Sequence, residues 1–300
     1  MQAEATVPVA LASGTAPSRV VDYFALTKPR LNFLVVATSA AGYYLGTQGT
    51  PDLAKMAAAV AGTAFVAGGA AALNQVYERD TDALMRRTRM RPLPDRRLAP
   101  GDARVFGLAL SGLGLALLAT RANLLAALLA LVTLIVYLVV YTPMKRRSPS
   151  ATLVGAVPGA LPPLIGWAAA SGSLSIGGWT LFAIVFLWQV PHFMAIAWLY
   201  RDDYRSAGFP LLPVVEPDGR QTGRQALAYA SALLPVSLVP TIVGLSGPIY
   251  FGLALVLGTA LLWLAVKFSR TRTNAAARAL FFASITYLPL IWIAMIASKQ

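Results

Sequence analysis

Cysteine is absent from this chain of 300 residues, and histidine occurs only once, as His192. Without cysteine the protein has no disulfide bond, no thiolate nucleophile and no cysteine-based metal site, and its redox compartment stays undetermined. Charged residues make up 12% of the sequence and hydrophobic residues 57%. Because no polar stretch is long enough to fold alone, this composition argues against a soluble protein and predicts a polytopic membrane protein.

Several familiar sequence signals are also missing. The chain has no Walker loop, no metal-protease motif and no nucleic-acid-binding module. Residues 1–20 lack a basic segment followed by an apolar core, and Glu4, Pro8 and Pro17 interrupt them. We therefore expect a disordered cytoplasmic tail over residues 1–20 rather than a cleavable signal. The net charge of +13 does not indicate nucleic acid, because the basic residues fall in short loops between apolar runs.

The apolar residues form nine runs near the length of a bilayer span, each bounded by charge, glycine or proline. They cover residues 31–48, 55–78, 103–120, 122–141, 152–170, 177–199, 225–245, 248–267 and 277–297. The fifth run contains Pro158, Pro162 and Pro163, which predicts a kinked helix with freed carbonyl groups. We therefore predict an all-α domain over residues 21–300, with nine transmembrane helices bundled around a central cavity in the lipid bilayer.

The basic residues predict the orientation of this bundle. Of the 25 Lys and Arg residues, 22 fall on one side of the predicted membrane, and only Lys55, Arg121 and Lys299 fall on the other. Cytoplasmic loops carry the excess of Lys and Arg. The sequence therefore predicts a cytoplasmic N-terminus, an outer C-terminus and a cytoplasmic position for the polar clusters described next.

The first polar cluster leaves the second apolar run as Asn74, Glu78 and Asp82. A step of four residues turns a helical side chain by only ~40°, so the three project from one face over about 12 Å. An amide and two carboxylates on one stripe are the hard oxygen ligands that Mg²⁺ accepts, usually together with water and substrate phosphate. The stripe therefore predicts a magnesium site at the membrane boundary.

The second cluster, Asp202 and Asp203, follows the sixth run on the same predicted side and is flanked by Arg201 and Arg205. If the two clusters face each other across a cavity, their oxygens offer ligands to two Mg²⁺ ions, and nearby Arg and Lys residues offer charge to a diphosphate. The alternative is that each cluster is an interfacial cap in which Arg pairs with Asp and nothing binds.

These motifs resemble the intramembrane aromatic prenyltransferases, and within them the haem-prenylating branch. The resemblance covers roughly residues 20–297. It rests on Asn74-x-x-x-Glu78-x-x-x-Asp82 with the run to Pro92, Tyr141-Thr-Pro-Met-Lys145-Arg146, Pro162-Pro-Leu-Ile-Gly-Trp167, Trp188-Gln-Val-Pro-His-Phe193 and Tyr200-Arg-Asp-Asp-Tyr204. Quinone-type members carry Asp where Tyr200 and Tyr204 stand here, which favours the haem branch. An Asn expected shortly after the Lys-Arg run is absent.

The resemblance implies transfer of a farnesyl group from farnesyl diphosphate to a vinyl group of protohaem IX, with Mg²⁺ as cofactor. The product, haem O, also carries a hydroxyl group, so water must add, and the sequence does not indicate from where. The implied site has Asn74, Glu78, Asp82, Asp202 and Asp203 as catalytic metal ligands. The implied diphosphate contacts are Arg87, Arg91, Lys145 and Arg146, although membrane topology alone also explains a Lys-Arg run at that point.

The haem contacts implied by the resemblance are His192, Trp188, Tyr200 and Tyr204. On a continuous helix, eleven residues from His192 to Asp203 give three full turns to within ~20° and a rise of about 16 Å. His192 would then lie below the diphosphate, where its imidazole could meet a porphyrin. The alternative is an ordinary hydrogen-bonded histidine in the helix core.

Two other functions stay open at this point. One is a related enzyme that prenylates a quinone precursor or a chlorin, and the other is a transporter whose acidic clusters bind cations. The latter would be supported by inverted sequence repeats, which the chain does not show. The resemblance places the protein in a bacterial inner membrane, in haem A and cytochrome oxidase biogenesis, with a downstream haem-modifying membrane enzyme as a partner.

Overall fold

The computed structural model describes residues 18–300, and these residues are helical apart from turns and one isolated β-bridge between Ser246 and Lys299. The all-α prediction is therefore confirmed. Most of the predicted tail, residues 1–17, lies outside the described residues. Its last two residues, Arg19 and Val20, begin a short helix, α1 (Arg19–Leu26), which the sequence analysis did not predict.

The long helices follow the predicted apolar runs. They are α2 (Pro29–Gly46), α3 (Leu53–Asp82), α4 with the π-helical η1 (Pro100–Leu117, Leu118–Ala122), α5 with the π-helical η2 and α6 (Leu124–Ile135, Val136–Tyr141, Thr142–Met144), α7 (Ala151–Ser171), α8 (Ile176–Leu199), α11 (Arg220–Ile242), α12 (Pro248–Thr271) and α13 (Asn274–Ala297). Eight of these helices in the described chain are long and apolar enough to cross a membrane. The remaining one is α2, which carries polar Asn32, Thr38 and Ser39. The protein is therefore a multi-pass membrane protein.

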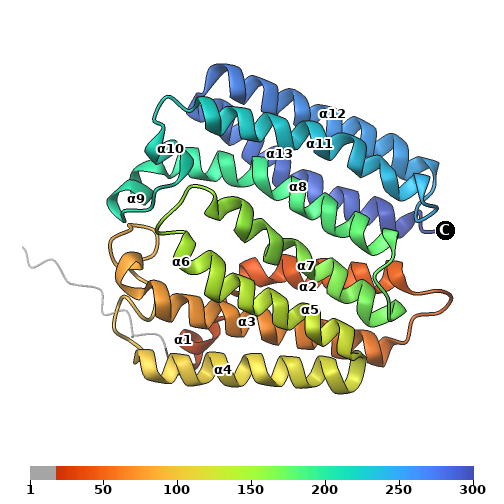
Figure 1. Cartoon of the computed structure of the whole chain (residues 1–300), viewed down its shortest axis with the longest axis horizontal. Helices are drawn as coiled ribbons and strands as arrows, with labels where there is room; N and C mark the ends of the chain where they lie inside the picture. Colours follow the sequence, from red (N-terminus) through yellow and green to blue (C-terminus); the bar gives the residue numbers. More distant parts are fainter. Residues whose placement is uncertain (1–17) are drawn as a thin grey trace, which may run out of the picture.

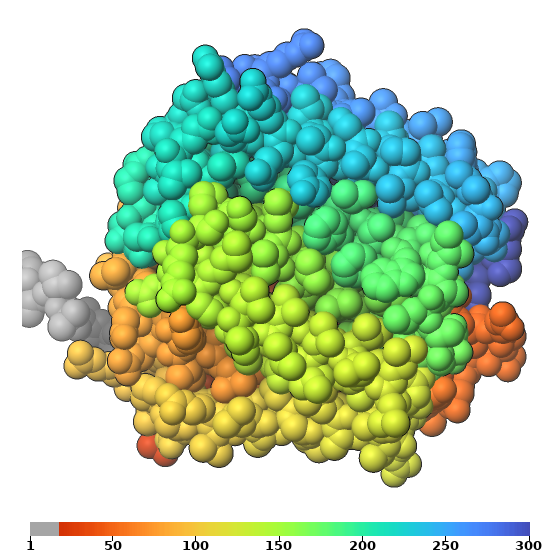
Figure 2. Space-filling model, viewed as in Figure 1, coloured from red at the N-terminus to blue at the C-terminus, as the bar shows by residue number. Residues whose placement is uncertain are grey.

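The long helices run side by side along the longest axis of the molecule (Figure 1). The short helices α9 (Arg201–Ser206) and α10 (Leu212–Val215) lie at one end of the bundle together with the loop over residues 83–99, and the C-terminus lies at the other end. We call the first of these the loop end. In the space-filling view, the yellow-green segment from α5 to α7 lies across the middle of one face, between the C-terminal helices and α4 (Figure 2).

Glycine lets α2 and α7 approach closely in the middle of the bundle. A Cβ atom on Gly42 would lie 2.1 Å from the carbonyl oxygen of Pro163, and one on Gly166 would lie 1.9 Å from that of Ser39. Real Cβ atoms do not tolerate such distances, so these two positions require glycine at this helix separation. The close packing fixes α7, which stays helical through all three of its prolines, as one wall of the cavity described below.

Candidate active site

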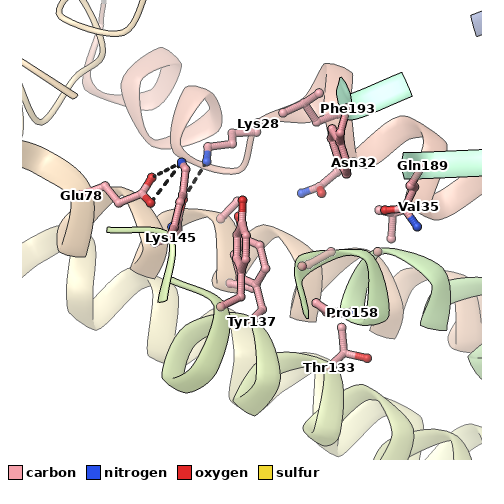
Figure 3. Close-up of a pocket in the computed structure, with 18 of the residues that line it drawn as sticks. Lys28, Asn32, Val35, Glu78, Thr133, Tyr137, Lys145, Pro158, Gln189 and Phe193 are labelled. Atoms are coloured by element: carbon pink, nitrogen blue, oxygen red, sulfur yellow. Dashed lines mark hydrogen bonds and ion pairs between the residues drawn. The ribbon is translucent and has the colours of Figure 1, made fainter. Parts of the chain in front are cut away.

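A cavity of about 390 Å³ lies between α2, α3, α7, α8 and the segment from α5 to Lys145. Its polar lining gathers at the loop end, where α3 supplies Asn74, Glu78 and Asp82. Further from the loop end the lining is mainly apolar, with Val35, Pro158 and neighbouring side chains around Thr133 and Gln189 (Figure 3). One end of the cavity therefore suits a charged group and the rest suits an apolar one.

The predicted stripe on α3 is present, and each of its side chains is buried. Asn74, Glu78 and Asp82 are 2%, 3% and 1% exposed, and all three line the cavity. Asn74 accepts a hydrogen bond from Lys28 Nζ at its Oδ1 (3.0 Å) and donates one to Thr142 Oγ1 from its Nδ2 (3.2 Å). The amide is therefore held in one orientation, with its oxygen directed toward the other polar groups of the site.

Glu78 is paired with Lys145, as Figure 3 shows. Lys145 Nζ lies 3.2 Å from Glu78 Oε1 and 3.3 Å from Oε2, and it also lies 4.6 Å from the centre of the Phe209 ring. Burial lowers the pKa of Lys145, but the Glu78 carboxylate, together with Tyr204 and Tyr137, raises it by more, so the pKa lies above its usual value. Lys145 is therefore a fixed positive charge in the cavity wall.

Asp82 is paired on one side only. Its Oδ2 accepts a hydrogen bond of 2.7 Å from Arg91 Nη1. Thr88 Oγ1 donates to the Asp82 backbone carbonyl (2.8 Å) and so folds the 83–99 loop back over the end of α3. The other carboxylate oxygen, Oδ1, is buried and has no hydrogen-bond partner. A buried carboxylate oxygen without a donor is costly, so Asp82 offers one ready ligand position.

Lys28 joins this group although the sequence analysis used it only as a topological charge. It precedes Pro29 in the left-handed conformation, with φ 49°, and this turn directs its side chain to Asn74. Burial, and then repulsion from Arg91, lower the pKa of Lys28 to about 8. Three ligand-type side chains on α3 therefore face three cations, Lys28, Lys145 and Arg91.

Tyr137 and Tyr141 form the wall next to these charges. They are stacked with ring centres 5.4 Å apart and both line the cavity. Both belong to the π-helical η2, whose wider turn carries the two rings on one side, and the Tyr141 ring rests against Gly155 of α7. Tyr141 was part of the motif that suggested the family. Tyr137 was missed, because a π-helical turn leaves no clear sequence signal.

Of the remaining predicted diphosphate and substrate residues, Arg87, Arg91, Lys145 and Tyr204 line the cavity. Tyr200 does not line it but lies beneath the Arg87 guanidinium, 5.9 Å from the ring centre. Arg146 is exposed and is not part of the cavity lining. The predicted Lys-Arg pair is therefore split, because adjacent residues at the end of α6 point in different directions.

The structure does not bring Asp202 and Asp203 to the cavity. The helix α8 ends at Leu199, Tyr200 has non-helical angles (φ −111°, ψ 21°), and the two acids lie on the separate helix α9. Asp202 is 80% exposed in its side chain and pairs with Arg205 at 2.9 Å. Over residues 18–300, no three His, Asp or Glu side chains cluster as a metal site. A second metal held by this pair stays a prediction.

His192 and Trp188 also lie away from the cavity lining, on the side of α8 that packs against α13. The His192 ring is stacked between Trp188 (5.0 Å) and Phe281 (5.1 Å), and its Nδ1 lies 2.8 Å from Ser284 Oγ. Trp188 Nε1 donates to the Ser284 carbonyl (2.7 Å). The continuous helix assumed for the step from His192 to Asp203 does not exist. These contacts favour the alternative of a hydrogen-bonded histidine packed between helices, and a haem contact through His192 stays a prediction.

Residues 35–286 match the UbiA prenyltransferase family. A protein named protoheme IX farnesyltransferase from Solibacter usitatus is 47% identical over 287 residues, which cover 93% of this chain and 98% of that protein. The protein of the same name from Opitutus terrae is 47% identical over 279 residues, which cover 93% and 94%.

Solved structures resemble the fold at low sequence identity. A structure of digeranylgeranylglyceryl phosphate synthase has a TM-score of 0.80 and 16% identity, over 93% of this chain and 98% of that one. A UbiA homolog from Archaeoglobus fulgidus bound to GPP and Mg²⁺ has a TM-score of 0.65 and 17% identity, over 92% and 99%.

Proposed function

Because the chain belongs to the UbiA prenyltransferase family, we propose that it transfers a farnesyl group from farnesyl diphosphate to a vinyl group of protohaem IX. The products are haem O and diphosphate. The observation that carries this proposal is the pairing of Asn74, Glu78 and Asp82 with three cations at the polar end of a largely apolar cavity. Such a cavity suits a diphosphate at one end and an isoprenoid chain in the rest.

The α3 stripe fits a magnesium ion. Asp82 Oδ1 is a buried carboxylate oxygen without a donor, and Glu78 and Asn74 supply further oxygen atoms of the type that Mg²⁺ prefers. A bound Mg²⁺ would supply Lewis-acid charge to a leaving diphosphate. The A. fulgidus homolog was solved with Mg²⁺ and a prenyl diphosphate, which supports the same cofactor here.

The cations of the site stabilise the leaving group. Lys145, Arg91, Arg87 and Lys28 line the cavity at its polar end, where fixed positive charges counter the charge that develops on the diphosphate as the allylic C–O bond breaks. The positions of Lys145, Arg91 and Lys28 are set before the substrate binds by Glu78, Asp82 and Asn74, respectively. The apolar walls around Val35 and Pro158 exclude bulk water from the reactive allyl cation.

The choice of haem as acceptor rests on the relatives, several of which, at 42–47% identity, are named protoheme IX farnesyltransferase. A quinone precursor or a chlorin is the alternative acceptor. We place the protein in a bacterial inner membrane, because the relatives are bacterial, with the loop end facing the cytoplasm, because 22 of the 25 basic residues fall on that predicted side. Haem O would then pass to a downstream haem-modifying membrane enzyme.

The test is a choice of acceptors. Purified protein in lipid vesicles receives farnesyl diphosphate, Mg²⁺ and equal amounts of haem, a chlorin and an aromatic quinone precursor, and mass analysis identifies the prenylated species. We expect farnesylated haem as the main product. Prenylation of the quinone precursor or chlorin with haem unchanged would contradict the choice of acceptor, while leaving the prenyltransferase assignment in place.

A further inference from the structure

The cavity wall holds one buried amide whose oxygen has no donor. Gln189 of α8 is 6% exposed and lines the cavity. Its Nε2 donates to the carbonyl oxygens of Ala156 (3.2 Å) and Val185 (3.1 Å). Because only the amide nitrogen can donate to two carbonyl groups, the orientation of the side chain is fixed. No donor in residues 18–300 bonds its Oε1, so this oxygen is left to the cavity.

A second acceptor, which lacks its intrahelical donor, belongs to Gly159, the residue of α7 against which Gln189 Oε1 packs. The carbonyl group of Gly159 on α7 would normally receive an N–H from residue 162 or 163, but both are proline, and proline has no N–H. Gly159 also lines the cavity, and a Cβ atom on it would lie 2.1 Å from Gln189 Oε1. The absence of a side chain at Gly159 is therefore what leaves Gln189 Oε1 open.

Two neighbouring acceptors in an apolar wall are matched by a molecule with two donors. Leaving either oxygen unbonded is unfavourable, and water is the small molecule that offers two O–H groups. When both of its hydrogens are donated to the wall, the lone pairs of the water oxygen face the cavity. That is the orientation of a nucleophile toward an electrophilic carbon held in the cavity.

The two acceptors, Gln189 Oε1 and the Gly159 carbonyl, lie where they suit a reaction at the diphosphate-bearing end of the prenyl chain. Tyr141 accepts a hydrogen bond from the Lys145 backbone N–H, and its ring touches Gly155. Gly159 is four residues further along α7, a rise of about 6 Å. Figure 3 shows Lys145 and Gln189 at opposite ends of the group of lining residues, with Tyr137 between them. A diphosphate at Lys145 would therefore place the first carbons of the allyl group between Lys145 and Gln189.

We propose that Gln189 Oε1 and the Gly159 carbonyl bind the water that becomes the hydroxyl group of the product; this rests on the proposed function. The allylic C–O bond breaks and diphosphate leaves with its electron pair. The terminal vinyl carbon then bonds to the farnesyl carbon, which leaves a cation on the vinyl carbon next to the porphyrin ring. The bound water adds its oxygen to that carbon and loses one of its two protons, the other staying on the new hydroxyl group, and the released diphosphate is the base that finally takes up the proton. Gln189 is a positioning residue in this step, because it acts through the water.

The test follows the oxygen atom in the product. Wild-type protein and the Gln189→Leu variant are incubated with haem, farnesyl diphosphate and Mg²⁺ in isotope-labelled water, and the haem pigments are analysed by mass. Wild type should give farnesylated haem that carries the labelled oxygen. Gln189→Leu should still form farnesylated haem, but the hydroxylated fraction should fall at least about tenfold, because one hydrogen bond to the water is worth that order. The missing fraction should appear as a product lighter by one water, formed by loss of a proton.

Gln75 offers a matched control. It is also a buried glutamine whose Nε2 donates to two backbone carbonyl oxygens, those of Leu26 and Ala71, but it does not line the cavity. Gln75→Leu should cost similar thermal stability and leave the product hydroxylated. If Gln189→Leu does not fold, Gly159→Ala replaces it, since the added methyl group forces Gln189 Oε1 away and should shift the product in the same way.

The outcomes separate this inference from the function on which it rests. Wild-type product without labelled oxygen, an unchanged hydroxylated fraction in Gln189→Leu or Gly159→Ala, or an equal loss in Gln75→Leu would each overturn the water site while the farnesyl transfer stands. Failure of the wild type to form any farnesylated haem would overturn the proposed function, and the water site with it.

Discussion

Replacing Lys145 by methionine should destabilise the fold as well as abolish the chemistry. Methionine keeps much of the aliphatic stem that packs near Phe209 but removes the charge 3.2 Å from Glu78. Glu78 is 3% exposed, so it would be left as a buried carboxylate without its partner. Removing one member of a buried ion pair costs about 3–5 kcal/mol. Because Lys145 keeps some exposure and Lys28 lies close by, we expect a loss of unfolding free energy at the lower end of this range, about 3 kcal/mol.

The assay is thermal unfolding of the purified variants in one detergent, with farnesyl transfer measured on the same samples. Lys145→Met should lower the Tm by on the order of 10 °C, because 1 kcal/mol corresponds to about 2–4 °C in a chain of this size class. The double variant Glu78→Gln with Lys145→Met should recover most of that loss, because the uncompensated charge is gone, yet remain inactive. Arg146→Met is the matched control, and since Arg146 is exposed its Tm should change little.

The stability of the double variant, compared with that of Lys145→Met alone, tests whether an uncompensated Glu78 charge causes the loss. If it is no more stable than Lys145→Met alone, the loss does not come from an uncompensated Glu78 charge, and the description of the site as a set of buried ligand–cation pairs is wrong. A Lys145→Met protein with wild-type Tm would contradict the same reasoning.

Three further predictions concern other parts of the chain. Asp82→Ala should lower farnesyl transfer by more than about 100-fold at normal expression, because even outer partners of a metal site cost about 10–100-fold; near-normal turnover would remove Asp82 from the site. His192→Ala should lower the Tm and leave the spectrum and affinity of bound haem unchanged, since its ring packs between Trp188 and Phe281, whereas an altered haem spectrum at unchanged Tm would return His192 to the haem site. A cysteine at Ser298 should react with an impermeant reagent only from the outer side, and because the chain has no native cysteine the labelling is unambiguous; reaction from the cytoplasmic side alone would reverse the orientation.

The part of the site that lies on one helix was predictable from the sequence. Asn74, Glu78 and Asp82 share a face of α3 because a four-residue step nearly completes a turn, and the structure buries all three in the cavity wall. The cations that pair with these three side chains were harder to predict from the sequence. Lys28 is 46 residues from Asn74 and reaches it through a left-handed turn before Pro29, which no periodic pattern indicates.

The continuous helix predicted from His192 to Asp203 was wrong for a physical reason. Residues 192–203 contain no glycine or proline, so nothing in the sequence indicates that the helix is interrupted after Leu199 and restarts as α9. Adjacent residues on a helix differ by about 100°. Gln189 therefore faces the cavity while Trp188 faces α13, and only the packing of neighbouring helices decides between the two sides.

The most direct test of the proposed function measures both products of one reaction. Purified protein in lipid vesicles is given haem, farnesyl diphosphate and Mg²⁺, and farnesylated haem and free diphosphate are quantified over the same time course, with and without a chelator. The proposed function predicts that the two products rise together in equal amounts and that both stop when the metal is removed. Diphosphate release without farnesylated haem, or haem farnesylation that continues in the chelator, would contradict it.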